Sequence, residues 1–251
     1  MAAVARVAEP QTPQPDAPAD APRADLPRFD RVAHLYQAME YLSFGPALER
    51  CRFHFIPALT RCRRALVLGD GDGRFLARLL KAAPHLHGDA VDASPTMLRL
   101  LEARVKKTGA TQRLNTFRSD ARCFDPPDAH YDLVATHFFL DCLTEPEADA
   151  LIARIRCHVA PEARWVVSEF QIPAGGWLRS AMARGIITFL YAAFRLLTGL
   201  RVRRIPPWRA LLERHGFRRT ASPPWLGGLL VSELWELQRA TAPAQKRSHL
   251  R

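Results

Sequence analysis

Apolar residues in the middle of the chain follow two alternating periods. Short apolar runs that predict buried strands occupy residues 65–69, 89–92, 114–118, 131–136 and 164–170. Between them, apolar residues recur at the spacing of a helix face, in residues 75–83, 95–105 and 145–159. This β-α-β-α order predicts a parallel sheet with helices on both faces, and ligands of such sheets bind outside the carboxyl ends of the strands.

Capping residues mark where two of these helices begin. Ser94 can cap a helix that has Pro95 at its first position. Thr144 and Glu147 have the spacing of a capping box and precede the last helix of the series. Further along, a helix at 207–215 precedes two closing strands near 218–221 and 229–237, and the two strands in tandem predict an antiparallel hairpin.

The first apolar run ends in three alternating glycines. Gly69, Gly71 and Gly73 allow a sharp turn and a close approach of the backbone to a ligand, and the following helix offers free N–H groups. About 20 residues later, Asp92 closes the second strand. The spacing is G-x-G-x-G, whereas dinucleotide enzymes have G-x-G-x-x-G, and no Lys-Ser/Thr pair follows. The pattern therefore predicts a nucleotide-like cofactor other than NAD or ATP.

Length and composition fit one large α/β domain, because 251 residues with 48% hydrophobic content can bury a sizeable core. The net charge of +11 is compatible with attraction to nucleic acid, anionic lipid or acidic substrates, and charge alone does not choose among them. The five cysteines lack the paired spacing of a zinc or redox site, so no metal is expected. Together with an N-terminus that has no apolar signal core, this favours a reduced, cytoplasmic setting.

Three segments stand apart from the domain, which is expected at 28–238. Residues 1–27 are rich in Pro and Ala and are expected to be disordered, and 239–251 form a basic tail. An insertion at 173–205 mixes apolar residues with arginines and is too charged and too short to span a bilayer. From Trp177 onward it could form a lid over the substrate, a peripheral membrane contact through 177–205, or a partner interface.

With these positions in place, the chain resembles the class I S-adenosylmethionine-dependent methyltransferases over roughly residues 28–237. Three patterns carry the resemblance in order: Gly69-Asp70-Gly71-Asp72-Gly73, then Val91-Asp92-Ala93-Ser94-Pro95-Thr96-Met97-Leu98, then Ser119-Asp120-Ala121. The resemblance implies an α/β fold with a Rossmann-like, seven-stranded, mostly parallel sheet whose last strand is antiparallel. It also implies S-adenosyl-L-methionine as the cofactor.

The same resemblance assigns cofactor contacts to individual positions. It gives the methionine part of the cofactor to the glycine loop, the ribose hydroxyls to Asp92 and the adenine amino group to Asp120. The remaining expected contacts lie beside these residues: Asp70, Ala93, Met97, Ala121 and Thr136. Independently, a carboxylate at the end of the second strand can accept two hydrogen bonds from a vicinal diol.

One position departs from the family. An acid often lies two residues before the first glycine, and here that residue is Val67. Asp70 or Asp72 would have to provide the contact to the amino group of the cofactor.

A further pattern resembles one branch of this family. Residues 29–36, Phe-Asp-Arg-Val-Ala-His-Leu-Tyr, are similar to the N-terminal segment of ubiquinone/menaquinone C-methyltransferase-like members. That segment usually covers the cofactor, which makes Tyr36 a candidate lid residue.

The residues that follow the fourth strand are expected to reach the substrate. His137 could act as a general base, since its ordinary pKa lies near neutrality, or it could serve packing or cofactor contact. Phe138 and Phe139 suit a sulfonium cation or a flat apolar substrate, and core packing is the alternative.

These observations predict a methyltransferase for a small-molecule or lipid-like acceptor, by O- or C-methylation. The alternatives are a nucleic-acid methyltransferase and a non-catalytic S-adenosylmethionine-binding protein. A nucleic-acid substrate is disfavoured because the Asp-Pro-Pro-Asp run at 125–128 precedes the fourth strand, whereas the D-P-P-Y motif that it resembles follows that strand.

Overall fold

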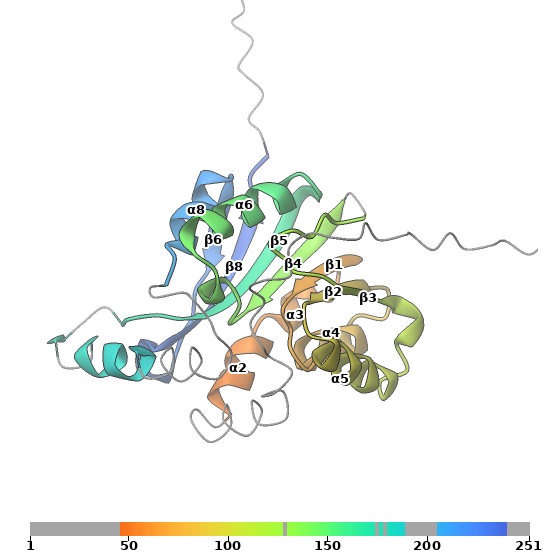
Figure 1. Ribbon diagram of the computed structural model, residues 1–251, viewed down its shortest axis with the longest axis horizontal. Coiled ribbons are helices and arrows are strands. Elements are labelled where there is room, and N and C mark those ends of the chain that lie inside the picture. The colour runs from red at the N-terminus through yellow and green to blue at the C-terminus, as the bar shows by residue number, and fades with distance from the viewer. Residues whose placement is uncertain (1–45, 128–129, 174–175, 178–179, 189–204, 240–251) are drawn as a thin grey trace, which may run out of the picture.

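The computed structural model describes residues 46–127, 130–173, 176–177, 180–188 and 205–239. Its centre is an eight-stranded sheet with the order β3-β2-β1-β4-β5-β8-β6, in which the short strand β7 pairs with β8 (Figure 1). The strands are β1 (Arg64–Leu68), β2 (His87–Asp92), β3 (Leu114–Arg118), β4 (Tyr131–His137), β5 (Val159–Phe170), β6 (Phe217–Ala221), β7 (Pro224–Trp225) and β8 (Leu230–Leu237).

Strand directions confirm the predicted fold class. The pairs β1–β2, β2–β3, β1–β4 and β4–β5 are all parallel. The last strand, β8, runs antiparallel to β5, β6 and β7. The sheet is thus mostly parallel with an antiparallel last strand, and the two-residue β7 is the addition to the seven strands expected.

Helices cover both faces, as the sequence predicts. Figure 1 shows α6 and α8 together on one side of the sheet and α3, α4 and α5 on the other. Each side has its own apolar cluster, the first including Leu151, Trp165 and Leu211, the second Phe75, Leu101 and Val166. The helices are α2 (Ala47–Phe53), α3 (Ile56–Leu59), α4 (Arg74–Ala82), α5 (Pro95–Lys106), α6 (Glu145–Arg156) and α8 (Trp208–Arg214), with the 3-10 turns η2 (Thr111–Arg113), η3 (Leu140–Cys142) and η4 (Leu226–Gly228).

Local chemistry explains where α5 and α6 begin. The backbone N–H of Met97 donates to Ser94 Oγ at 3.2 Å, so Ser94 caps α5 as predicted. At α6, the backbone N–H of Thr144 donates to Glu147 Oε2 at 2.8 Å, within the predicted capping box.

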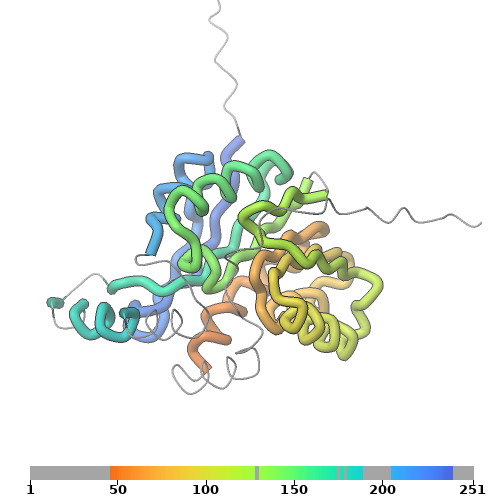
Figure 2. Tube along the Cα trace, viewed as in Figure 1, coloured from red at the N-terminus to blue at the C-terminus, as the bar shows by residue number. Residues whose placement is uncertain are grey.

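The N-terminal helix α2 lies at one edge of the sheet. Its Leu48 and Cys51 pack against Leu230 of β8. Figure 2 shows this helix (orange) and residues 180–188 (teal) on the same side of the molecule, away from α6 and α8. The turns that follow β1 and β4 come to the same edge, which makes it the edge where the functional residues gather.

Several expectations fall on residues that the structure leaves undescribed. Residues 1–27, the candidate lid residue Tyr36 and all but one residue of the basic tail 239–251 lie outside the described ranges. Of the insertion 173–205, residue 177 and residues 180–188 are described as helical. In the described part of the chain, no helix is long and apolar enough to cross a membrane.

Candidate functional site

The glycine loop and Asp92 lie next to each other at the carboxyl edge of the sheet. Because β1 pairs with β2, the backbone N–H of Gly69 donates to the carbonyl of Val91 at 2.9 Å, one residue before Asp92. On the far side of β2, the N–H of Ser119 donates to the carbonyl of Asp92 at 3.2 Å. Three neighbouring strands therefore bring the glycine loop, Asp92 and the Ser119-Asp120 turn into one row.

The three glycines all have positive φ, at 64°, 60° and 76°, but their surroundings differ. A Cβ on Gly69 would lie 2.3 Å from the ring of Phe139, and one on Gly73 would lie 2.7 Å from the Cα of Leu101 in α5. At Gly71 the nearest atom would be Met97 Sδ, 4.0 Å away. Gly69 and Gly73 thus permit packing within the protein, while the space beside Gly71 is not filled by any of the described residues.

The carboxyl group of Asp70 caps α4 and is almost completely buried. Its Oδ2 accepts a hydrogen bond from the backbone N–H of Leu76 at 2.9 Å. Its Oδ1 is buried and has no hydrogen-bond partner among the described residues. Burial raises the pKa of this carboxyl to about 7, and the nearby charge of Arg52 opposes part of that rise.

Asp72, the alternative acid in the loop, is held by two arginines. Its Oδ1 pairs with Arg74 Nε at 2.9 Å and its Oδ2 with Arg104 Nη2 at 2.7 Å. Of the two acids, Asp70 is therefore the one with a buried carboxylate oxygen that could accept a hydrogen bond from a cation.

Asp92 ends β2 with its side chain partly exposed, and its Oδ1 accepts the backbone N–H of Ser94 at 2.8 Å. This bond fixes the carboxylate at the start of α5. Ala93 is partly exposed beside it, and the buried Met97 lies one helical turn further on. The positions taken from the second motif are thus together at one place.

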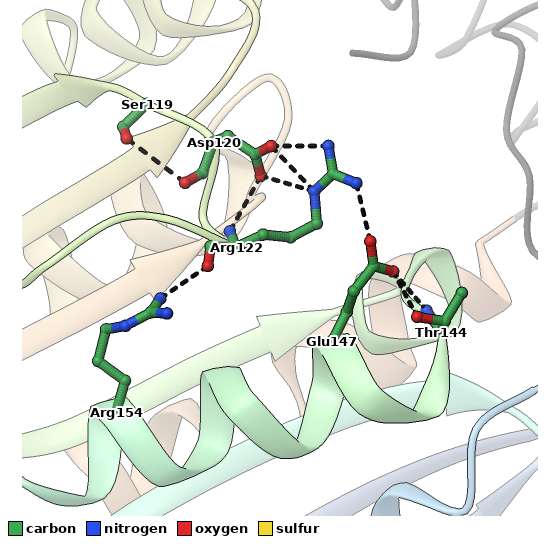
Figure 3. A network of polar contacts seen from close by, with 6 residues as sticks. All are labelled: Ser119, Asp120, Arg122, Thr144, Glu147 and Arg154. Atoms are coloured by element: carbon green, nitrogen blue, oxygen red, sulfur yellow. Dashed lines mark hydrogen bonds and ion pairs between the residues drawn. The ribbon is translucent and has the colours of Figure 1, made fainter. Parts of the chain in front are cut away.

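Asp120 is joined to Arg122 (Figure 3). The guanidinium Nε of Arg122 donates to both carboxylate oxygens, at 3.1 Å and 2.9 Å, and its backbone N–H donates to Oδ1 at 2.9 Å. Arg122 also pairs with Glu147 of α6 at 2.9 Å, while Ala121 is buried in the core. An adenine amino group would have to share the Asp120 carboxylate with Arg122.

The two polar residues at the end of β4 are buried. Thr136 Oγ1 accepts a hydrogen bond from Trp165 Nε1 at 3.1 Å, so this side chain is engaged on the α6 and α8 face. His137 is 3% exposed, its ring lies 4.2 Å from that of Phe75, and its Nδ1 is 2.9 Å from Ser168 Oγ. Its Nε2 is buried without a hydrogen-bond partner in the described chain.

Burial holds the pKa of His137 well below 6.5, and the positive charge of Arg52 adds to the effect. The imidazole is therefore neutral near pH 7. A neutral ring can accept a hydrogen bond at Nε2 when Nδ1 carries the proton.

Sequence reasoning missed Glu169, the penultimate residue of β5. Its side chain is fully buried, and its Oε1 accepts the backbone N–H groups of Phe139 and Leu140 at 3.2 Å and 2.8 Å. Burial and the neighbouring Asp141 raise its pKa well above the ordinary value. Glu169 thus fixes the turn after β4. The sequence feature that could have identified Glu169 is an acidic residue at the end of an otherwise apolar strand, because a buried carboxylate needs hydrogen-bond donors or a partner charge.

Arg52 of α2 was also missed. It is 4% exposed, and its guanidinium lies 5.5 Å from the ring centroid of Phe138. Phe138 has a φ of 54°, uncommon for a residue with a side chain, and its ring packs against Phe170. A buried cation and two aromatic rings therefore lie at the edge where the glycine loop ends.

Comparison with known proteins agrees with this arrangement. Residues 65–162 match the family described as "Methyltransferase domain". This range runs from β1 through α6 and ends in the first residues of β5. The chain has the class I S-adenosylmethionine-dependent methyltransferase fold.

Individual proteins are also similar to this chain. A ubiquinone/menaquinone biosynthesis C-methyltransferase, UbiE of Pseudomonas fluorescens, is 28% identical over 178 residues, which cover 68% of this chain and 67% of that protein. The S-adenosylmethionine-dependent methyltransferase SibL, solved in its apo form, superimposes with a TM-score of 0.62 at 21% identity, over 87% of this chain and 64% of its own.

An O-methyltransferase family 2 protein from Planctomyces limnophilus, solved with apigenin, gives a TM-score of 0.61 at 17% identity. This match covers 81% of the present chain and 61% of the other. The chain therefore spans less than two thirds of the length of these solved methyltransferases.

S-adenosylmethionine is the cofactor expected for this fold, and the residues present fit it. The buried Oδ1 of Asp70 without a partner in the described chain suits a cation such as an ammonium group. The described residues leave space beside Gly71, which gives room for a ligand against the backbone. Asp92 follows directly as the acid for a ribose diol.

Proposed function

We propose that this protein transfers the methyl group of S-adenosylmethionine to a small-molecule or lipid-like acceptor. The observation that carries the proposal is the hydrogen bond between the N–H of Gly69 and the carbonyl of Val91, which puts the loop and Asp92 side by side. In this assignment Asp92 binds the ribose hydroxyls, Asp70 the ammonium group and the backbone at Gly71 the methionine chain. Asp120 and Arg122 together border the adenine.

The bound cofactor would supply a methyl group already activated by the positive sulfur. The protein has then mainly to hold the acceptor in line with that methyl and to keep water away. Residues at the edge suit this task, because Phe138 and Phe139 are apolar and Glu169 fixes the turn that carries them. Aromatic faces also attract a cation such as a sulfonium.

For His137 we propose a role as hydrogen-bond acceptor. Its neutral Nε2 can accept a hydrogen bond from a hydroxyl group of the substrate that receives the methyl group, and this bond would orient that hydroxyl. Full uptake of the proton is opposed by burial and by Arg52, the two causes that lower its pKa. Ser168, 2.9 Å from Nδ1, would fix the ring.

The chemical class of acceptor follows from the relatives and from the apolar edge. The named relatives include a C-methyltransferase of quinone biosynthesis and an O-methyltransferase bound to apigenin, which are aromatic or lipid-like cases. We propose an acceptor of that kind, methylated on oxygen or carbon.

The proposal is tested by incubating the purified protein with S-adenosylmethionine labelled in the methyl group and with fractionated cell extract. We expect label to enter an organic-soluble small molecule and the Asp92→Ala variant to leave it unlabelled. Cofactor binding without transfer to any fraction would instead identify a non-catalytic binding protein.

A further inference from the structure

Exposed large apolar side chains gather on two segments of the described chain. Trp177 is 83% exposed and Met182 62%, values far above those expected of side chains that stabilise a core. The full set of large exposed hydrophobic residues in the described ranges is Ile172, Trp177, Met182, Ile186 and Leu226. We call these five residues the apolar patch.

The helix at 180–188 turns one side toward the protein and another toward solvent. Ala183 and Ile187 are buried and pack with Leu229, next to β8. Met182 and Ile186 are exposed on the same helix. The helix is therefore attached to the domain by one apolar side and presents a second apolar side to its surroundings.

The two segments that make up the patch are neighbours. The backbone N–H of Gln171 donates to the carbonyl of Leu229 at 2.9 Å. A Cβ on Gly228 would lie 3.0 Å from the Cβ of Pro173. Ile172 and Leu226 are thus on adjoining stretches of chain, and the helix at 180–188 is attached to the same stretch through Leu229.

The stretch of sequence that contains the helix at 180–188 has charged residues of a single sign. Residues 170–212 contain no Asp or Glu, and they contain seven arginines, at positions 179, 184, 195, 201, 203, 204 and 209. Arg209 pairs with Glu233 at 2.9 Å, whereas Arg184 is exposed between Met182 and Ile186. Apolar side chains edged by arginines match an anionic lipid surface, which offers negative headgroups above an apolar interior.

We propose that the apolar patch docks this protein on anionic membranes, lying in the interface without crossing it. Trp177, Met182 and Ile186 would enter the headgroup region while Arg184, exposed on the same helix, pairs with acidic lipids. A nucleic acid would use the arginines but would leave three exposed apolar side chains without a partner.

The surface also lies close to the candidate site. Phe170 packs against the cluster that holds the helix at 180–188, and its ring lies 5.2 Å from that of Phe138. If methyl transfer occurs as proposed above, a lipid-borne acceptor would reach the site from this side; this consequence rests on the proposed function, and docking itself does not.

The test is flotation of the full chain with vesicles of phosphatidylcholine alone and of phosphatidylcholine with phosphatidylglycerol. We expect binding to the anionic vesicles that weakens at higher salt. A triple variant, Trp177→Ser with Met182→Ser and Ile186→Ser, should bind at least about tenfold more weakly because its buried apolar area is lost. Arg184→Gln should weaken binding to the anionic vesicles about fivefold. Lys106→Gln, which removes an exposed charge on α5, should leave this binding unchanged.

Circular dichroism melting checks that each variant is folded, so that lost binding reports on the surface. Equal flotation of the folded triple variant would overturn the proposal. So would equal binding to neutral vesicles, or retention on a DNA duplex at the same salt that the triple variant leaves unchanged. Because no cofactor or acceptor is needed, failure here is distinct from failure of methyl transfer.

Discussion

At the scale of single residues, the glycines of the loop after β1 have separate tasks. Gly69 leaves room for Phe139 and Gly73 for the backbone of α5, so their replacement disturbs packing within the protein. Among the described residues, the atom nearest to a Cβ on Gly71 is Met97 Sδ at 4.0 Å. Replacing Gly71 should therefore affect ligand binding more than it affects the stability of the fold.

Gly71→Ala should lower the affinity for S-adenosylmethionine by at least about tenfold, because an added methyl group fills the ligand space. Its cost in unfolding free energy should be only about 1–2 kcal/mol, the strain of an L residue at a φ of 60°. Gly109→Ala is the matched control, since Gly109 has a φ of 73° and nothing within 4 Å of an added Cβ. Equal affinity of the two variants would refute the assignment of Gly71.

The raised pKa of Asp70 predicts that the stability of the fold depends on pH. Its pKa rises from 3.8 to about 7 on folding, so the folded state holds the proton to higher pH than the unfolded state does. Ionisation of Asp70 therefore destabilises the fold as pH rises between these two values. Relative to Asp70→Asn, the wild-type free energy of unfolding should fall by up to about 1.4 kcal/mol per pH unit in this window.

Urea unfolding of both proteins across the window measures this difference. A wild-type curve parallel to that of Asp70→Asn would contradict the raised pKa. Binding adds a second readout, because an ammonium group near Oδ1 favours the ionised carboxyl. Affinity for S-adenosylmethionine should therefore increase from about pH 6 to about pH 8 in the wild type more than in the variant.

At the scale of elements, the start of α6 connects the fold to the site. Glu147 accepts hydrogen bonds from Thr144 at the helix end and pairs with Arg122, which in turn holds Asp120. The capping box thus supports the turn that borders the proposed adenine position.

Thr144→Ala should reduce the free energy of unfolding by about 1 kcal/mol, since the cap side chain is lost, while Thr144→Ser should be close to neutral. Thermal unfolding followed by circular dichroism measures both. Equal stability of the Ala and Ser variants would show that the hydroxyl contributes nothing to this helix end.

The elements with strong periodicity or caps were predictable from the sequence. The third strand has the observed bounds Leu114–Arg118, and α5 begins after Ser94 as expected. The elements that were not predicted include α2, α3 and β7, which are short and are stabilised by tertiary packing rather than by local pattern, and the helix at 180–188. The strand β5 begins at Val159, earlier than expected, and Pro161 lies in the irregular part of its pairing with β4, between the pairs Tyr131–Val159 and Leu133–Arg164.

Some residues of the candidate site could be predicted from the sequence and others could not. Gly69 and Asp92 were found because parallel strands bring their carboxyl ends to one edge, a rule that sequence spacing is enough to apply. Arg52 and Glu169 were not found, since their roles depend on α2 and on the turn after β4 folding against the sheet. The cofactor contacts themselves stay predictions.

At the scale of the whole molecule, chemistry concentrates on one edge of the sheet. The glycine loop, Asp92, His137 and Glu169 all lie where strands end, and α2 adds Arg52 from the N-terminal side. The opposite ends of the strands carry structural pairs such as Tyr131 with Asp89. This polarity explains how one parallel sheet can keep a stable core and still present a reactive edge.

A calorimetric titration of the protein with S-adenosylmethionine tests most directly whether the glycine loop and Asp92 bind this cofactor. We expect saturable binding that Asp92→Ala weakens by about tenfold or more, the value of a charged hydrogen-bond acceptor for two hydroxyls. Asp125→Ala, which removes a carboxylate that is 81% exposed, should leave binding unchanged. No heat of binding at near-millimolar cofactor, or equal affinity of the two variants, would contradict this assignment.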